Sequence, residues 1–229
     1  MVNGYGRIPI ALTVSVMASA AVGGEFNARG NEPGWSIRKA ATGITFSTMD
    51  GRMVTIAPLP QVHRTDGGEL YRSTTEGKPF ALSIVARVCT DTMTGMPYPR
   101  SVTVEIGAEK FAGCGGDPVD LLQGEWTVKK IDGRPPAKEP KISLSFGTEA
   151  QLTGNASCNR YFGSYALSTE SLTISQLGTS MMMCDRPIMD QETQFLGILR
   201  EIQRFAIGQD RSLILHAKDG RSIAASRNR

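Results

Sequence analysis

The chain has 229 residues, a formal net charge of +3 and 40% hydrophobic residues. These values are typical of a globular protein with one large or two modest domains, and each half can bury a core without a metal or a disulfide. So small a charge argues against a dedicated nucleic-acid binder, which concentrates basic residues on one surface.

The N-terminal segment has the pattern of a secretory signal peptide. Arg7 is the only charge before Glu25, and an apolar run over residues 8–22 contains small residues at 18–20, a suitable cleavage site. A membrane anchor or a buried first strand is the alternative, but the run is shorter than the roughly 20 residues that span a bilayer. We therefore expect cleavage of residues 1–20, a periplasmic or secreted chain and no transmembrane segment after cleavage. No cysteine stands directly after the run, so a lipid anchor is not expected.

Residues 26–117 are predicted to form an all-β domain. Segments 44–49 and 52–56 flank Asp50-Gly51, which predicts a hairpin because both turn positions favour positive φ. Further alternating segments lie at 69–74, 80–89, 100–106 and 110–114, with almost no helical period between them. This pattern is typical of an antiparallel sandwich or small barrel.

A Gly-rich stretch near residue 118 marks the domain boundary, and residues 120–226 form the second predicted domain. Apolar residues recur at helical spacing over 187–205, after Asp185 as a possible N-cap. The other segments alternate as strands do, at 126–128, 142–146, 172–177, 204–207, 213–217 and 222–225. The chain is thus predicted to be mainly β, with one helix packed on the second sheet.

Four cysteines follow the N-terminal segment, an even number that favours disulfides in an exported chain. Three connectivities are possible. The pairs Cys89–Cys114 and Cys158–Cys184 each stay within one predicted domain and each close a loop of roughly 25 residues, which stabilises by about 3–4 kcal/mol. Free thiols are an alternative. A metal site is disfavoured because the cysteines are well separated and the chain has only two histidines.

Residues 121–225 resemble the META domain, or HslJ-like, family. The likeness is carried in order by Gly124-x-Trp126, Cys158-Asn159-Arg160, the segment 179–184 that ends in Met-Met-Met-Cys, and Met189-x-x-Glu192-x-x-Phe195. One departure is Ser157, where the family usually has glycine. The resemblance implies export or lipid anchoring, and an association with stress or antibiotic tolerance, but supplies no catalytic site.

The first domain is similar to a group of uncharacterised bacterial envelope proteins. The matching segments are 26–35, Cys89 to Gly95, Tyr98-Pro99 and 113–115. No functional residue is implied by this likeness.

Four residues are candidates for recognition or for fixing loops. Asn159 can satisfy turn backbone groups, and Arg160 can pair with a carboxylate or phosphate, with Glu192 on the predicted helix as a possible partner. Asp91 could contact a metal or ligand, although turn formation is the commoner role of aspartate in such a loop. The methionines 181–183 could bind soft metals, but core filling is the favoured interpretation.

No hydrolase motif surrounds His63 or His216, and no phosphate-binding glycine-rich loop occurs. We therefore expect a non-enzymatic envelope protein without a cofactor, which binds an envelope protein or a small apolar or cell-wall ligand. The alternatives are an inhibitor of a lysozyme or protease that uses loop 90–100 as a plug, and an enzyme that uses paired carboxylates.

Overall fold

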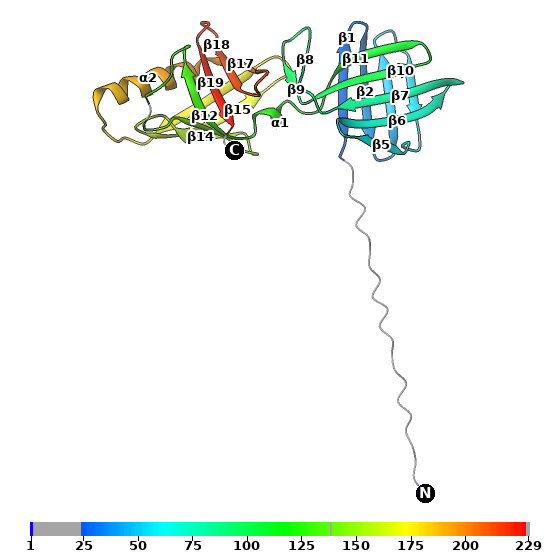
Figure 1. Cartoon of the computed structure of the whole chain (residues 1–229), viewed down its shortest axis with the longest axis horizontal. Helices are drawn as coiled ribbons and strands as arrows, with labels where there is room; N and C mark the ends of the chain where they lie inside the picture. Colours follow the sequence, from blue (N-terminus) through cyan, green and yellow to red (C-terminus); the bar gives the residue numbers. More distant parts are fainter. Residues whose placement is uncertain (2–23, 138, 228–229) are drawn as a thin grey trace.

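The computed structural model describes Met1, residues 24–137 and residues 139–227. The predicted signal peptide therefore lies outside the described residues, apart from Met1. Two antiparallel β bodies lie side by side, and the short helix α1 (Val119–Leu122) and the hairpin of β8 (Cys89–Thr90) and β9 (Pro97–Tyr98) lie between them (Figure 1). No helix among the described residues combines the length and apolar character needed to cross a membrane.

The first body is a nine-stranded antiparallel sheet in the order β4-β3-β2-β1-β11-β10-β7-β6-β5. Alternate residues of its strands, such as Ile44 and Phe46, point into one apolar core because side chains alternate across a strand. Its strands are β1 (Phe26–Asn31), β2 (Gly34–Ala40), β3 (Gly43–Thr48), β4 (Met53–Ile56), β5 (Val62–Thr65), β6 (Gly68–Thr75), β7 (Lys78–Val85), β10 (Arg100–Ile106) and β11 (Glu109–Gly115).

The predicted hairpin at Asp50-Gly51 is confirmed as β3–β4. Of these two residues Gly51 alone has positive φ, at 93°, although positive φ was expected at both. The strand prediction for this body differs from the structure in two places. The segment 80–89 is not one strand, since β7 ends at Val85 and the chain bends before the β8–β9 hairpin. Strands β1 and β2 were not predicted, although Trp35 and Ile37 alternate into the core.

The second body is an eight-stranded antiparallel sheet in the order β16-β15-β14-β13-β12-β19-β18-β17. Its edge strands β16 and β17 lie beside each other, so the sheet curls into a nearly closed barrel. The strands are β12 (Gly124–Ile131), β13 (Ser143–Phe146), β14 (Gln151–Asn155), β15 (Arg160–Leu167), β16 (Leu172–Thr179), β17 (Ile202–Ile207), β18 (Leu213–Ala217) and β19 (Ser222–Arg227).

Helix α2 (Arg186–Arg200) packs its apolar stripe on this sheet, and the ring centroid of Phe195 lies 5.7 Å from that of Tyr161 on β15. The predicted helix was too long. Ile202 and Phe205 continue the apolar spacing but belong to β17, where pairing with β18 replaces helical hydrogen bonds. Asp185 occupies the N-cap position without a side-chain capping bond.

Candidate functional site

Both disulfides have the predicted pairing. Cys89–Cys114 ties β8 to β11 with a Cα–Cα distance of 5.4 Å, and Cys158–Cys184 ties the β14–β15 turn to the segment before α2 at 6.0 Å. All four sulfurs are bonded, so none offers a thiolate nucleophile. Two disulfides fit an oxidising compartment.

Asn159 is the centre of a hydrogen-bonded clamp beside the second disulfide. Its side-chain oxygen accepts from Ser180 Oγ at 2.8 Å and from the backbone N–H of Met182 at 2.7 Å. Its Nδ2 donates to Met182 O at 3.2 Å and to Glu192 Oε1 at 2.9 Å. The predicted role of Asn159 in satisfying backbone groups therefore matches these contacts.

Glu192 projects from α2 into this clamp and contacts Asn159 rather than Arg160. Its Oε2 accepts from the Asn159 backbone N–H at 2.6 Å. Glu192 and Asn159 are only 6% and 3% exposed. A buried carboxylate needs such donors because burial penalises an unpartnered charge. The arrangement fixes the turn against the helix and leaves neither residue free to meet a ligand.

Ser157 takes a backbone conformation that favours glycine, with φ 123°. Its N–H donates to Asn155 Oδ1 at 2.9 Å, and its hydroxyl accepts from Gln191 Nε2 at 2.9 Å. Where the family usually has glycine, this chain therefore has a side chain on a backbone of positive φ, which costs conformational strain. The serine hydroxyl gains one hydrogen bond from Gln191 on α2.

Arg160, in contrast, points outward. Its backbone N–H donates to Ser180 Oγ at 3.2 Å, while its guanidinium forms no ion pair with any described carboxylate. It lines a shallow groove on the outer face of the second sheet, together with Glu125 and Phe162. Arg160 is thus the one predicted recognition residue of the second domain that a ligand can reach.

Asp91 organises the turn of the β8–β9 hairpin, which is the role that its sequence context favoured. Its Oδ1 accepts from the backbone N–H groups of Met93 and Thr94 at 3.0 and 2.8 Å, and Asn31 donates to Oδ2 at 3.2 Å. Burial alone would raise the pKa of this carboxyl. The hydrogen bonds from Thr94, Asn31 and Met93 outweigh burial, and the pKa lies below its usual value.

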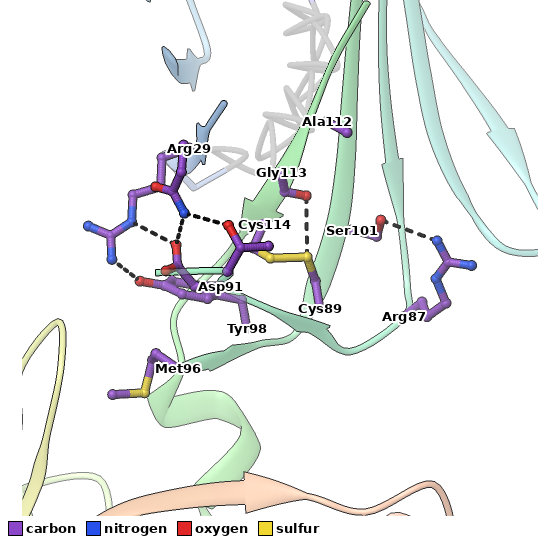
Figure 2. Close-up of a disulfide and its surroundings, with 12 residues drawn as sticks. Arg29, Arg87, Cys89, Asp91, Met96, Tyr98, Ser101, Ala112, Gly113 and Cys114 are labelled. Atoms are coloured by element: carbon purple, nitrogen blue, oxygen red, sulfur yellow. Dashed lines mark hydrogen bonds and ion pairs between the residues drawn. A yellow bond between two sulfur atoms is a disulfide. The ribbon is translucent and has the colours of Figure 1, made fainter. Parts of the chain in front are cut away.

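Arg29 joins this hairpin to the first sheet (Figure 2). Its Nη2 donates to Tyr98 OH at 2.7 Å and its guanidinium lies 5.6 Å from the centre of the Tyr98 ring. The Arg29 Nε lies 3.9 Å from Asp91 Oδ2 and is buried without a hydrogen bond of its own. Asp91 and Arg29 therefore hold each other in place as part of the scaffold.

The hairpin also connects the two bodies. Met96 and Tyr98 are 2% and 8% exposed and belong to the apolar core of the second body. The hairpin tip remains open, where Met93 is 78% exposed, and Thr90 and Arg100 at the ends of loop 90–100 are exposed as well. The part from Met96 to Tyr98 of the predicted inhibitory plug is thus buried within the chain.

The interpretation of the three methionines as core residues was wrong. Met181, Met182 and Met183 are 97%, 53% and 94% exposed. They lie in an irregular segment between β16 and α2, which the Asn159 clamp and the second disulfide hold against the β14–β15 turn. Both ends of the segment are fixed to the surface, so its side chains face solvent.

A larger cleft lies where the two bodies meet. It has a volume of about 860 Å³, and Arg87 and Arg100 from the first body line it together with Arg211 and Arg227 from the second. Asp120 is the single carboxylate in its lining. All four arginines are exposed, and none forms an ion pair with a described carboxylate. The cleft therefore presents an excess of positive charge.

Trp126 and Arg227 form one wall of this cleft. The Arg227 guanidinium lies 4.6 Å from the centre of the Trp126 ring, and its Nη2 donates to Leu121 O at 3.0 Å. Trp126 itself is 1% exposed and donates to Leu122 O at 2.7 Å. The tryptophan thus holds the arginine in place, with N–H groups remaining to donate outward.

This cleft was not predicted from the sequence. Its arginines come from four separate segments, and only the packing of the two bodies brings them together. Single arginines in loops and at strand ends carry no local pattern that would distinguish them from ordinary surface residues. Of the four candidate recognition residues, Arg160 lines an open groove, whereas Asp91, Asn159 and Glu192 are buried.

The second domain has a known relative. A model of the META domain matches residues 119–229, which confirms the resemblance in that part of the chain. Residues 119–229 are therefore a META domain. The match covers no part of the first domain, so the likeness of residues 26–117 to envelope proteins stays a prediction.

Solved structures match about half of the chain. An NMR structure of a protein from Burkholderia xenovorans is 26% identical, with a TM-score of 0.41, over 49% of this chain and 88% of that one. Another NMR structure is 21% identical, with a TM-score of 0.39, over 48% and 93%. A crystal structure of a DUF4847 family protein from Bacteroides vulgatus is 14% identical, with a TM-score of 0.37, over 49% and 98%. No curated protein matches this chain.

Proposed function

We propose that the protein is an exported, non-enzymatic binding protein of the bacterial envelope, which holds an anionic ligand in the cleft between its two bodies. The observation that carries this proposal is the set of four arginines, two from each body, that line one cleft without ion-pair partners among the described residues. The two disulfides and the signal-like segment 1–20 support a periplasmic or secreted location.

Arginine suits this role because its planar guanidinium donates paired hydrogen bonds to carboxylates and phosphates and stays charged at every physiological pH. Apolar residues also line the cleft, among them Val88, Leu121 and Ile207. The ligand we expect is therefore an anionic amphiphile, with its acid group on the arginines and its apolar part against these side chains. A role in envelope stress tolerance would follow if that ligand is a membrane-active compound.

In the test, the purified, oxidised protein is titrated with dodecyl phosphate below its micelle concentration, and binding is measured by calorimetry. The double variant Arg87→Ala/Arg211→Ala removes one arginine from each body. Each ion pair between an exposed arginine and the ligand contributes about 1 kcal/mol. Removing two arginines should therefore lower the affinity roughly 30-fold. Arg72→Ala and Arg186→Ala remove exposed arginines outside the cleft and should leave binding unchanged.

Two further results complete the test. Affinity should fall as salt is added, because ions screen exposed charges, and the neutral dodecyl maltoside should bind far less. If the control variants weaken binding as much as the cleft variants do, or if both detergents bind alike, the cleft is not an anion site.

A further inference from the structure

The outer face of the META domain carries a second groove, which shares no lining residue with the arginine cleft. It has a volume of about 600 Å³ and crosses strands β12 to β15. Most of its lining residues point away from the barrel core. Leu144 and Tyr161 also line it, but they are buried.

Strand pairing places the groove residues in two rows. Glu125 lies opposite Ser145, Ser145 opposite Thr153 and Thr153 opposite Phe162, so that one row runs across four strands. Directly paired residues share a face of the sheet, and neighbouring strands are about 4.8 Å apart, so this row is roughly 14 Å long. Small hydroxyl side chains in the middle, between a carboxylate and an aromatic ring, produce the hollow.

The second row runs beside the first. Arg160 lies opposite Asn155, and the Asn155 backbone N–H donates to Ser143 Oγ at 3.1 Å. The Arg160 guanidinium forms no ion pair with a described carboxylate. The two rows together offer a cation, an amide, hydroxyls and a carboxylate within one shallow trough.

Phe162 is the unusual member of this surface, since a large apolar side chain is 60% exposed among polar neighbours. The ring lies close against Gly178 on β16, where an added Cβ would come within 2.6 Å of Phe162 Cζ. Glycine at this position lets the ring rest on the sheet. The contact with Gly178 covers one part of the Phe162 ring. Much of the ring surface stays open to solvent.

We infer that this groove binds an acidic oligosaccharide. The open ring of Phe162 suits the apolar C–H side of a sugar ring, because an aromatic face carries partial negative charge and C–H groups partial positive charge. Hydroxyl, amide and carboxylate side chains match sugar hydroxyls, which both donate and accept. Arg160 supplies the partner for one sugar carboxylate. The length of the row suits several linked rings better than one.

The experiment titrates the full, oxidised protein with trigalacturonate and, separately, with the neutral chitotriose, and follows amide shifts by NMR. We expect trigalacturonate to bind with millimolar affinity or better and to shift amides of β13 to β15. Chitotriose should bind at least fivefold more weakly. Equal binding of the two sugars, or shifts confined to other strands, would overturn the assignment.

Two variants test the residues. Phe162→Leu still covers Gly178 but has no aromatic face, and Arg160→Gln keeps a polar chain but no charge. Each should weaken trigalacturonate binding at least fivefold, with a thermal midpoint close to that of the parent, whereas Arg72→Gln should leave binding unchanged. Full binding by both groove variants would refute the inference. The cleft variant Arg87→Ala/Arg211→Ala should bind the sugar normally, so failure of the cleft proposal and failure of the groove can be told apart.

Discussion

Replacing Asn159 by alanine should destabilise the META domain while leaving the first domain intact. The substitution removes four side-chain hydrogen bonds: Asn159 donates one to Met182 O and one to Glu192, and accepts one from Met182 N–H and one from Ser180. Ser180 and Met182 are exposed enough for water to replace part of what they lose. Glu192 is not, because it is 6% exposed and would keep only the backbone N–H of residue 159.

The expected loss follows from this difference. A hydrogen bond to a buried charged group contributes roughly 1.5–3 kcal/mol and each partly exposed neutral bond less, which gives about 2–4 kcal/mol in total. For a domain of this size such a loss lowers the thermal midpoint by roughly 10–20 °C. Asn159→Asp should cost more than Asn159→Ala at neutral pH, because it places a second carboxylate beside Glu192.

The chain offers a convenient assay. It contains two tryptophans, Trp35 in the first core and Trp126 in the second. In a Trp35→Phe background, fluorescence during urea unfolding reports the META domain alone. In a Trp126→Phe background it reports the first domain, which should be unaffected by Asn159→Ala.

A suitable control is Asn27→Ala, since Asn27 is exposed and its side-chain hydrogen bond to Glu25 Oε1 is long, at 3.5 Å. It should change the free energy of unfolding by less than about 0.5 kcal/mol. If Asn159→Ala costs less than about 1 kcal/mol under the same conditions, the clamp does not stabilise the domain as argued.

Three other outcomes are expected. Ser157→Gly should be more stable than Ser157→Ala by about 1–2 kcal/mol in urea unfolding, because both lose the hydroxyl but only glycine relieves the positive φ; a more stable alanine variant would contradict the strain. The Asp91 carboxyl has a lowered pKa when folded, so it stabilises the first domain above its unfolded pKa and this contribution is lost as pH falls through the folded value. Asp91→Asn should therefore flatten the acid limb of the stability–pH curve below about pH 4, and an unchanged limb would argue against the Asp91 network. Replacing Cys89 and Cys114 together by serine should cost about 3–4 kcal/mol of first-domain stability, measured by urea unfolding, and a loss below about 1 kcal/mol would contradict this.

Much of the fold could be predicted because its signals are local. Alternation identified many of the strands, Asp50-Gly51 identified a hairpin, and cysteine spacing identified both disulfides. Strands β14 and β15 were not predicted because glycines and serines obscure their alternation, although Tyr161 and Tyr165 face the core. The end of α2 was misplaced because Ile202 and Phe205 fit helical spacing by coincidence, and their strand pairing depends on β18, which lies further along the chain.

The roles of some candidate site residues could likewise be predicted from local sequence, and those of others could not. Asn159 and Asp91 were identifiable as turn-forming residues from residue type and neighbours, and the structure gives them those contacts. The sequence could not show whether Glu192 contacts Asn159 or Arg160. Adjacent residues of an extended segment point in opposite directions, and which of the two faces the helix was unknown. The exposure of Met181 to Met183 was not predicted because a run of apolar residues usually indicates core residues. Here the Asn159 clamp and the second disulfide hold the segment at the surface.

The arginine cleft depends on the hairpin that joins the two bodies. Arg87 lies two residues before Cys89 and Arg100 lies two residues after Tyr98, so both cleft arginines of the first body flank this hairpin. The Cys89–Cys114 disulfide fixes one end of it, and burial of Met96 and Tyr98 in the second core sets its distance from Arg211 and Arg227. Holding like charges close together before a ligand arrives lowers the ordering cost of binding. The same hydrogen bonds and disulfide that exclude Asp91 from recognition thus place the residues that we propose to perform it.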